Sequence, residues 1–114
     1  MDVRETLALD KPEELRKWLQ DNHRTKMEIW LVFYKKSSGR QTLTIAQAVD
    51  EALCFGWIQS RTKTHNAQRF AVRFSPRRKG SIWSLPNLKQ VRKLIAQRKM
   101  TEFGLAVLPA DFKE

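Results

Sequence analysis

The sequence predicts an α+β fold, in which a small antiparallel sheet of about three strands packs against four or so helices. Helical and extended patterns follow one another in the order helix, strand, helix, hairpin, helix, helix. The 114 residues suffice for one hydrophobic core without disulfides, and no linker or repeat divides them. Apolar residues make up 41% of the chain and charged residues 30%, which is typical of globular proteins. We therefore treat residues 1–114 as a single domain.

The first half of the chain predicts a helix, a strand and a second helix. Asp10 and Glu13 are typical of a helix start, with Asp10 as the cap. Residues 29–34 (IWLVFY) are apolar or aromatic without alternation, so we expect a central strand covered on both faces. A capping-box pattern at 44–47 (TIAQ) begins the next helix. Gly56 is expected to end it, because glycine adopts the left-handed conformation without steric cost.

Residues 57–64 and 69–75 predict a β-hairpin, and the cost of burying charge decides its register. A two-residue turn places Arg61 and Lys63 on the core face without partners, at several kcal/mol each. We therefore favour a three-residue turn, which pairs Lys63 with Arg69. The solvent face then carries Arg61, Lys63, Arg69 and Arg73 together with Trp57 and Gln59.

Two further helices are expected in the last third of the chain. Ser84 caps the first of them, and its apolar stripe consists of Leu88, Val91, Leu94 and Ile95. Thr101 begins a short final helix, which ends at Pro109.

The net charge of +10 lies entirely in the second half of the chain. Residues 1–60 contain nine basic and nine acidic side chains, whereas residues 61–114 contain 13 basic and three acidic ones. Between Arg61 and Lys99 there is no carboxylate. A long segment of one sign favours an anionic partner, with a simple solubility surface as the alternative.

The sequence offers little support for catalysis. His23 and His65 have no nucleophile or acid beside them, and Cys54 lies near a helix C-terminus, where the dipole raises a thiol pKa. One cysteine and two separated histidines give no metal-ligand spacing, and the four glycines form no nucleotide-binding loop. We expect no catalytic residue, no metal and no cofactor, and the sequence favours a non-enzymatic protein.

Hydropathy and the N-terminal sequence predict the cellular location. No apolar stretch reaches the roughly 20 residues of a membrane span. The first residues also lack the hydrophobic run of a signal peptide. We expect a cytoplasmic protein.

The basic loop after the hairpin is the most informative segment for function. It leads into a helix N-terminus, where unpaired N–H groups and arginine forks suit a phosphate or carboxylate. The candidate anion- or nucleic-acid-binding residues are Arg61, Lys63, Arg69, Arg73, Arg77, Arg78, Lys79 and Ser81. Trp57 and Trp83, with Glu51, are candidates for a pocket with flat stacking surfaces. For the two tryptophans we favour the alternative of core packing, and Glu51 is a candidate buried partner for an arginine.

Two motifs carry a family resemblance. They are DEALCFGWI at 50–58 and RFSPRRKGSIWS at 73–84. With them the chain resembles the YdeI/OmpD-associated family, also called bacteriocin-protection proteins, of which it would be a short form. The resemblance implies a small bacterial cytoplasmic protein linked to envelope stress, with no established enzymatic activity or cofactor. Matching motif residues are Glu51, Trp57, Arg73, Arg77, Arg78, Ser81 and Trp83.

The sequence thus predicts a non-enzymatic protein that binds an anionic partner, with nucleic acid as the favoured polyanion. The first alternative is a pocket, enzymatic or not, for a metabolite bearing phosphate or carboxylate. The second is a dimeric protein-interaction module.

Overall fold

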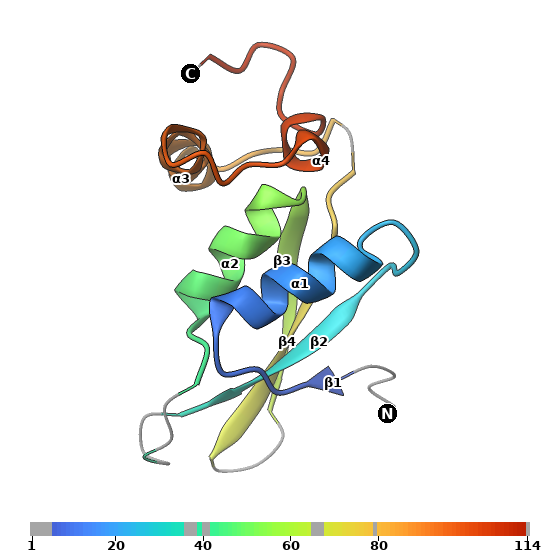
Figure 1. The fold of residues 1–114 in the computed structure, drawn as a ribbon, viewed down its shortest axis with the longest axis vertical. Coiled ribbons are helices and arrows are strands. Elements are labelled where there is room, and N and C mark those ends of the chain that lie inside the picture. Colours follow the sequence, from blue (N-terminus) through green and yellow to red (C-terminus); the bar gives the residue numbers. More distant parts are fainter. Residues whose placement is uncertain (1–5, 36–38, 40–41, 65–67, 79, 114) are drawn as a thin grey trace.

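A computed structural model describes residues 6–35, 39, 42–64, 68–78 and 80–113, and within them it contains one sheet and four helices (Figure 1). The sheet order is β1-β2-β4-β3. The strands are β1 (Thr6–Leu7), β2 (Ile29–Tyr34), β3 (Trp57–Thr64) and β4 (Arg69–Pro76). The helices are α1 (Pro12–Asn22), α2 (Ile45–Cys54), α3 (Leu85–Ala96) and α4 (Glu102–Leu105). The predicted α+β class is confirmed.

Strand β1 makes the sheet larger than the sequence predicted. It pairs in parallel with β2, Thr6 opposite Trp30 and Leu7 opposite Leu31, whereas the other pairings are antiparallel. The sheet is therefore mixed and has four strands rather than about three antiparallel ones. Two residues are too few to show an alternating pattern, so the sequence gives no signal for β1.

The helix starts are held by side chains close in sequence. Thr44 Oγ1 accepts the Gln47 N–H at 3.1 Å and Gln47 Oε1 accepts the Thr44 N–H at 3.0 Å, as the capping box predicted. The expected cap of α1 is wrong by one residue: the N-cap is Lys11 instead of Asp10, and Glu14 instead of Glu13 accepts the N–H groups of Asp10 and Lys11, both at 2.9 Å.

The hairpin register differs from the predicted one. Lys63 lies opposite Ala71, two residues from the expected partner Arg69, and Arg61 lies opposite Arg73. A bulge between Gln59 and Arg61 then shifts the pairing. Residues on the two sides of a bulge change face, because one strand contains an extra residue.

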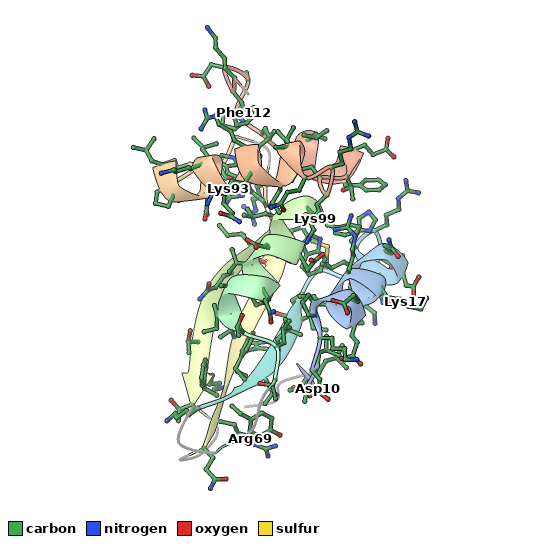
Figure 2. The ribbon with its side chains drawn as sticks, turned by 60° about the vertical axis from the view of Figure 1, so that its left-hand side comes forward. Asp10, Lys17, Arg69, Lys93, Lys99 and Phe112 are labelled. Carbon is green, nitrogen blue, oxygen red and sulfur yellow. The ribbon has the colours of Figure 1, made fainter. Side chains whose placement is uncertain are left out.

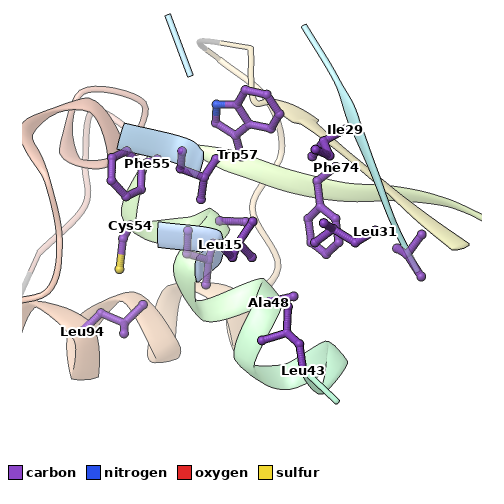
Figure 3. Close-up of a cluster of buried hydrophobic side chains, with 14 of the residues drawn as sticks. Leu15, Ile29, Leu31, Leu43, Ala48, Cys54, Phe55, Trp57, Phe74 and Leu94 are labelled. Atoms are coloured by element: carbon purple, nitrogen blue, oxygen red, sulfur yellow. The ribbon is translucent and has the colours of Figure 1, made fainter. Parts of the chain in front are cut away.

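The bulge turns Trp57 into the core instead of onto the solvent face. Trp57 lies opposite Pro76 and is 1% exposed, next to Phe74 and Leu15 in the cluster of Figure 3. The core lies between the sheet and helices α1 and α2, which cover one face of it (Figure 1). Strand β2 is buried on both faces, as predicted.

Helix α4 closes the end of the core by packing on the C-terminus of α2. Thr101 donates both its N–H and its hydroxyl to the carbonyl oxygen of Cys54. Gly56, at φ +75°, allows the chain to leave α2 and enter β3 at this point. The carbonyl group of Cys54, at the end of α2, thus finds its partners in the C-terminal segment.

Candidate anion-binding surface

The side of the sheet away from α1 and α2, here called the outer face, carries most of the hairpin cations. Alternation along paired strands puts Ile29, Leu31 and Phe33 in the core and the residues between them on the outer face. By the same pairing the outer face contains Arg61, Lys63, Arg69 and Arg73 around Trp30, Val32 and Ala71. The structure therefore brings together four of the predicted anion-binding residues.

Arg73 is the fixed cation of this face. Its Nε donates to Glu28 Oε1 at 2.6 Å, and its Nη1 donates to Ser60 Oγ at 3.1 Å and Ser75 Oγ at 3.3 Å. Ser60 lies at the bulge, so the irregular pairing places a hydroxyl beside the guanidinium. Glu28 offsets the charge of Arg73.

Arg61 is exposed and directly opposite Arg73. Like charges in this position cost a few tenths of a kcal/mol, which an anionic ligand would remove. Among the described residues, no carboxylate forms an ion pair with Arg61. The strand pairing fixes the backbone of Arg61, and its exposed guanidinium is available to a partner.

Cations of α3 and of the residues after it lie at the other end of the molecule. Figure 2 shows Arg69 near the hairpin tip, whereas Lys93 and Lys99 belong to α3 and the residues after it. The longest axis of the molecule measures 43 Å. The carboxylate-free segment from Arg61 to Lys99 therefore forms two separate basic regions instead of one.

Arg77 occupies the junction between these two regions and is only 5% exposed. Its guanidinium carbon lies 3.8 Å from the centre of the Trp83 ring, and its Nη1 donates to Ser81 Oγ and the Ile82 carbonyl at 3.1 Å. Its Nε and Nη2 are buried without a hydrogen-bond partner. Burial lowers the pKa of Arg77 below its ordinary value.

The other predicted loop residues lie around Arg77 in different environments. Arg78 is exposed and Ser81 is half-buried, with its hydroxyl on the Arg77 guanidinium. Lys79 lies outside the described residues. The Trp83 Nε1 donates to the Val107 carbonyl at 3.2 Å, which ties this loop to the C-terminal segment.

Glu51 lies with Arg16, away from the two tryptophans of the predicted pocket. Its Oε1 accepts a hydrogen bond from Arg16 Nη1 at 3.0 Å, and Arg16 Nη2 donates to the Lys99 carbonyl. Glu51 is 5% exposed, so it is the buried arginine partner that the sequence left open. Trp57 belongs to the core and Trp83 stacks on Arg77, so the three residues have separate surroundings.

Two cavities lie beside the start of α1. A hollow of about 880 Å³ lies at the start of α1 and α2, with the stacked rings of Phe33 and Phe70 among its walls. A smaller one of about 380 Å³ is lined by Arg16 and Glu51 with Arg98 and Lys99.

Within the described residues no group of three or more acidic, histidine or cysteine side chains is placed to hold a metal ion. None of the helices described there is long and apolar enough to cross a bilayer.

Sequence reasoning missed Glu28 and Ser60, which hold Arg73, and Arg16, which holds Glu51. Glu28 is next to a strand and far in sequence from its partner. No local pattern identifies such pairs. The β-branched and aromatic run at 29–34 predicts the strand that neighbours Arg73, but it does not predict their pairing.

The fold and this surface define a small α+β protein with a four-stranded mixed sheet and a basic outer face. Residues 7–107 match the family described as a domain of unknown function, DUF8412, and the chain belongs to that family. No curated protein matches the chain, and neither does any solved structure. The resemblance to the YdeI/OmpD-associated family is not tested by these findings and stays a prediction.

Proposed function

We propose that the protein is non-enzymatic, acts in the bacterial cytoplasm and binds a polyanion, with duplex nucleic acid as the favoured partner, through the outer face of its sheet. One observation carries the proposal. Arg61 and Arg73 are direct cross-strand partners on a face that also presents Lys63 and Arg69. The guanidinium of Arg73 is already held by Glu28, Ser60 and Ser75, so it loses little conformational freedom when it contacts a phosphate. A role in stress or bacteriocin protection follows only from the family resemblance.

The burial of the aromatic rings favours phosphate contacts over base stacking. Trp30, which lies on the outer face, is buried, and Trp57 is in the core. Binding of single strands relies on exposed rings, whereas a duplex is bound through its backbone charges. The basic residues of the loop and of α3 extend the surface, so a long polyanion contacts both ends of the molecule.

Fluorescence anisotropy with labelled duplexes tests the proposal. Because the molecule is 43 Å long, affinity should rise with duplex length up to about 13 base pairs. The logarithm of the affinity should fall with the logarithm of salt concentration, with a slope of about −0.9 per phosphate neutralised. Failure to bind at micromolar protein in low salt contradicts the proposal.

A matched pair of variants separates the outer face from overall charge. The double change Arg61→Glu and Lys63→Glu should weaken binding at least roughly tenfold and reduce the salt slope by about 2. The control, Lys11→Glu with Lys17→Glu, makes the same change in net charge around α1, on the covered side of the sheet. If both double variants lose affinity for the duplex to the same extent, net charge alone determines binding.

A second candidate function is protein interaction, including self-association. Two large apolar side chains beside the basic loop, Ile82 and Leu85, are 94% and 81% exposed. Exposed apolar groups of this size are typical of interaction sites when they lie together. Light scattering of the wild type and of Ile82→Ser tests for a dimer, which the variant should weaken.

A further inference from the structure

We propose that Arg77 is the centre of a binding site for a small carboxylate. Nε–H and Nη2–H form one edge of the planar guanidinium, and they are the two groups without a partner. A carboxylate has two coplanar oxygens at the spacing of these two donors, so it accepts both hydrogen bonds at once. The site lies at the end of β4, apart from the outer face, and does not depend on the proposed nucleic-acid binding.

The surroundings of Arg77 orient the free edge. Trp83 covers a face of the guanidinium, while the hydroxyl of Ser81 and the carbonyl of Ile82 hold Nη1. These contacts occupy one end of the group and leave the opposite edge unpaired. A side chain fixed in this way binds an anion without further loss of freedom.

The charge balance selects the class of ligand. Among the described residues, no carboxylate forms an ion pair with Arg77, although the residue is 5% exposed. An unpaired charge away from water is strongly disfavoured, and a monoanion compensates a single guanidinium without leaving an excess. Both nitrogens are covered by neighbouring protein atoms, so an anion reaches them only when those atoms move aside, and it has to be small, as acetate and formate are.

NMR of the arginine Nε–H signals tests the site directly in the wild-type protein. Titration with acetate at constant ionic strength should shift the Arg77 signal saturably, with a dissociation constant on the order of 1 mM. Chloride should leave the signal in place. If acetate moves the Arg77 signal no more than chloride does, ordered water satisfies the two donors, and the proposal is overturned. Saturation by inorganic phosphate but not by acetate would show that the assignment to a carboxylate is wrong.

Variants provide a second readout through thermal unfolding. Acetate should raise the Tm of the wild type and of Arg78→Met, whose side chain is exposed and adjacent. It should not raise the Tm of Arg77→Lys, which keeps the charge but lacks the two-donor edge. Charge reversal at Arg61 and Lys63 should leave the acetate response unchanged. An acetate response retained in Arg77→Lys contradicts the proposal, and if this variant does not fold, the titration of the wild type decides.

Discussion

Gly104 of α4 lies directly against the carbonyl group of Cys54 at the end of α2. A methyl group at Gly104 would lie 2.5 Å from that carbonyl oxygen and 2.7 Å from the carbonyl oxygen of Leu53. Both contacts are with backbone, which does not move as easily as a side chain. The close approach of the two helices therefore requires glycine at this position.

We predict that Gly104→Ala lowers the free energy of unfolding by about 1–3 kcal/mol, because α4 has to move away from α2. Gly39→Ala is the control, since Gly39 has a positive φ of +74° but open space around it. It should cost only about 1–2 kcal/mol from backbone strain. Urea unfolding measures the free energy of unfolding of both variants. An unfolding midpoint of Gly104→Ala equal to that of the wild type would contradict the close contact between Gly104 and the end of α2.

The buried ion pair of Glu51 and Arg16 should stabilise the fold more than an exposed pair. Glu51→Ala leaves the Arg16 guanidinium partly buried without its carboxylate, at a cost of about 2 kcal/mol. Asp21→Ala removes the partner of Lys17 in the exposed pair on α1 and should cost less than about 0.5 kcal/mol. Similar unfolding midpoints for the two variants would show that the buried pair stabilises the fold no more than the exposed pair does.

We predict that the protein loses stability in acid when the Glu14 carboxylate is protonated. Two backbone N–H groups, from Asp10 and Lys11, hold the pKa of the Glu14 carboxyl below its ordinary value. The charged form is favoured in the folded state, so its contribution is complete above the ordinary pKa and is lost as the pH falls through the lowered one. NMR titration of the carboxyl should show the lowered pKa directly.

The neighbouring acid provides the control for this acid dependence. Glu13 lies in the same turn and is exposed. Glu14→Gln should make the decline of stability below about pH 4.3 less steep, and Glu13→Gln, which makes the same change in net charge, measures the effect of charge alone. Identical pH profiles in the two variants would contradict the role assigned to Glu14.

Cys54 should react slowly with thiol reagents in the folded protein. Burial raises the pKa of its thiol, and the neighbouring Arg16 opposes this only in part. Because the neutral form is favoured on folding, this contribution is complete below the ordinary thiol pKa and is lost as the pH rises from about 8.5 towards the raised value. A disulfide reagent at pH 8 should label the thiol fully in urea and only through unfolding in buffer. Rapid labelling of the native protein would contradict the burial.

Local signals explain which parts of the fold were predictable. Thr44 and Gln47 are three residues apart and cap each other, so these four residues suffice to predict the start of α2. The apolar run at 29–34 likewise identified a strand buried on both faces. The bulge beside Ser60 has no such signature, because it depends on how two strands fit against α2 and the core.

The candidate site was predictable in its composition and not in its arrangement. Arg61, Lys63, Arg69 and Arg73 share a face, as the three-residue turn predicts, although Lys63 lies opposite Ala71 instead of Arg69. Simple alternation predicts Trp57 on that face, whereas the core packing that we favoured for its ring is confirmed. The bulge reverses the alternation, and the ring enters the core.

The sequence by itself determined the α+β class, the limits of α2 and the restriction of positive charge to the second half, because these depend on neighbours within a turn or a strand. The tertiary structure alone decided that Glu28 pairs with Arg73, that Glu51 pairs with Arg16 and that Arg77 is buried against Trp83. Each of the first two contacts joins residues at least 35 positions apart. Such contacts form only when the core brings distant elements together, so no local pattern encodes them.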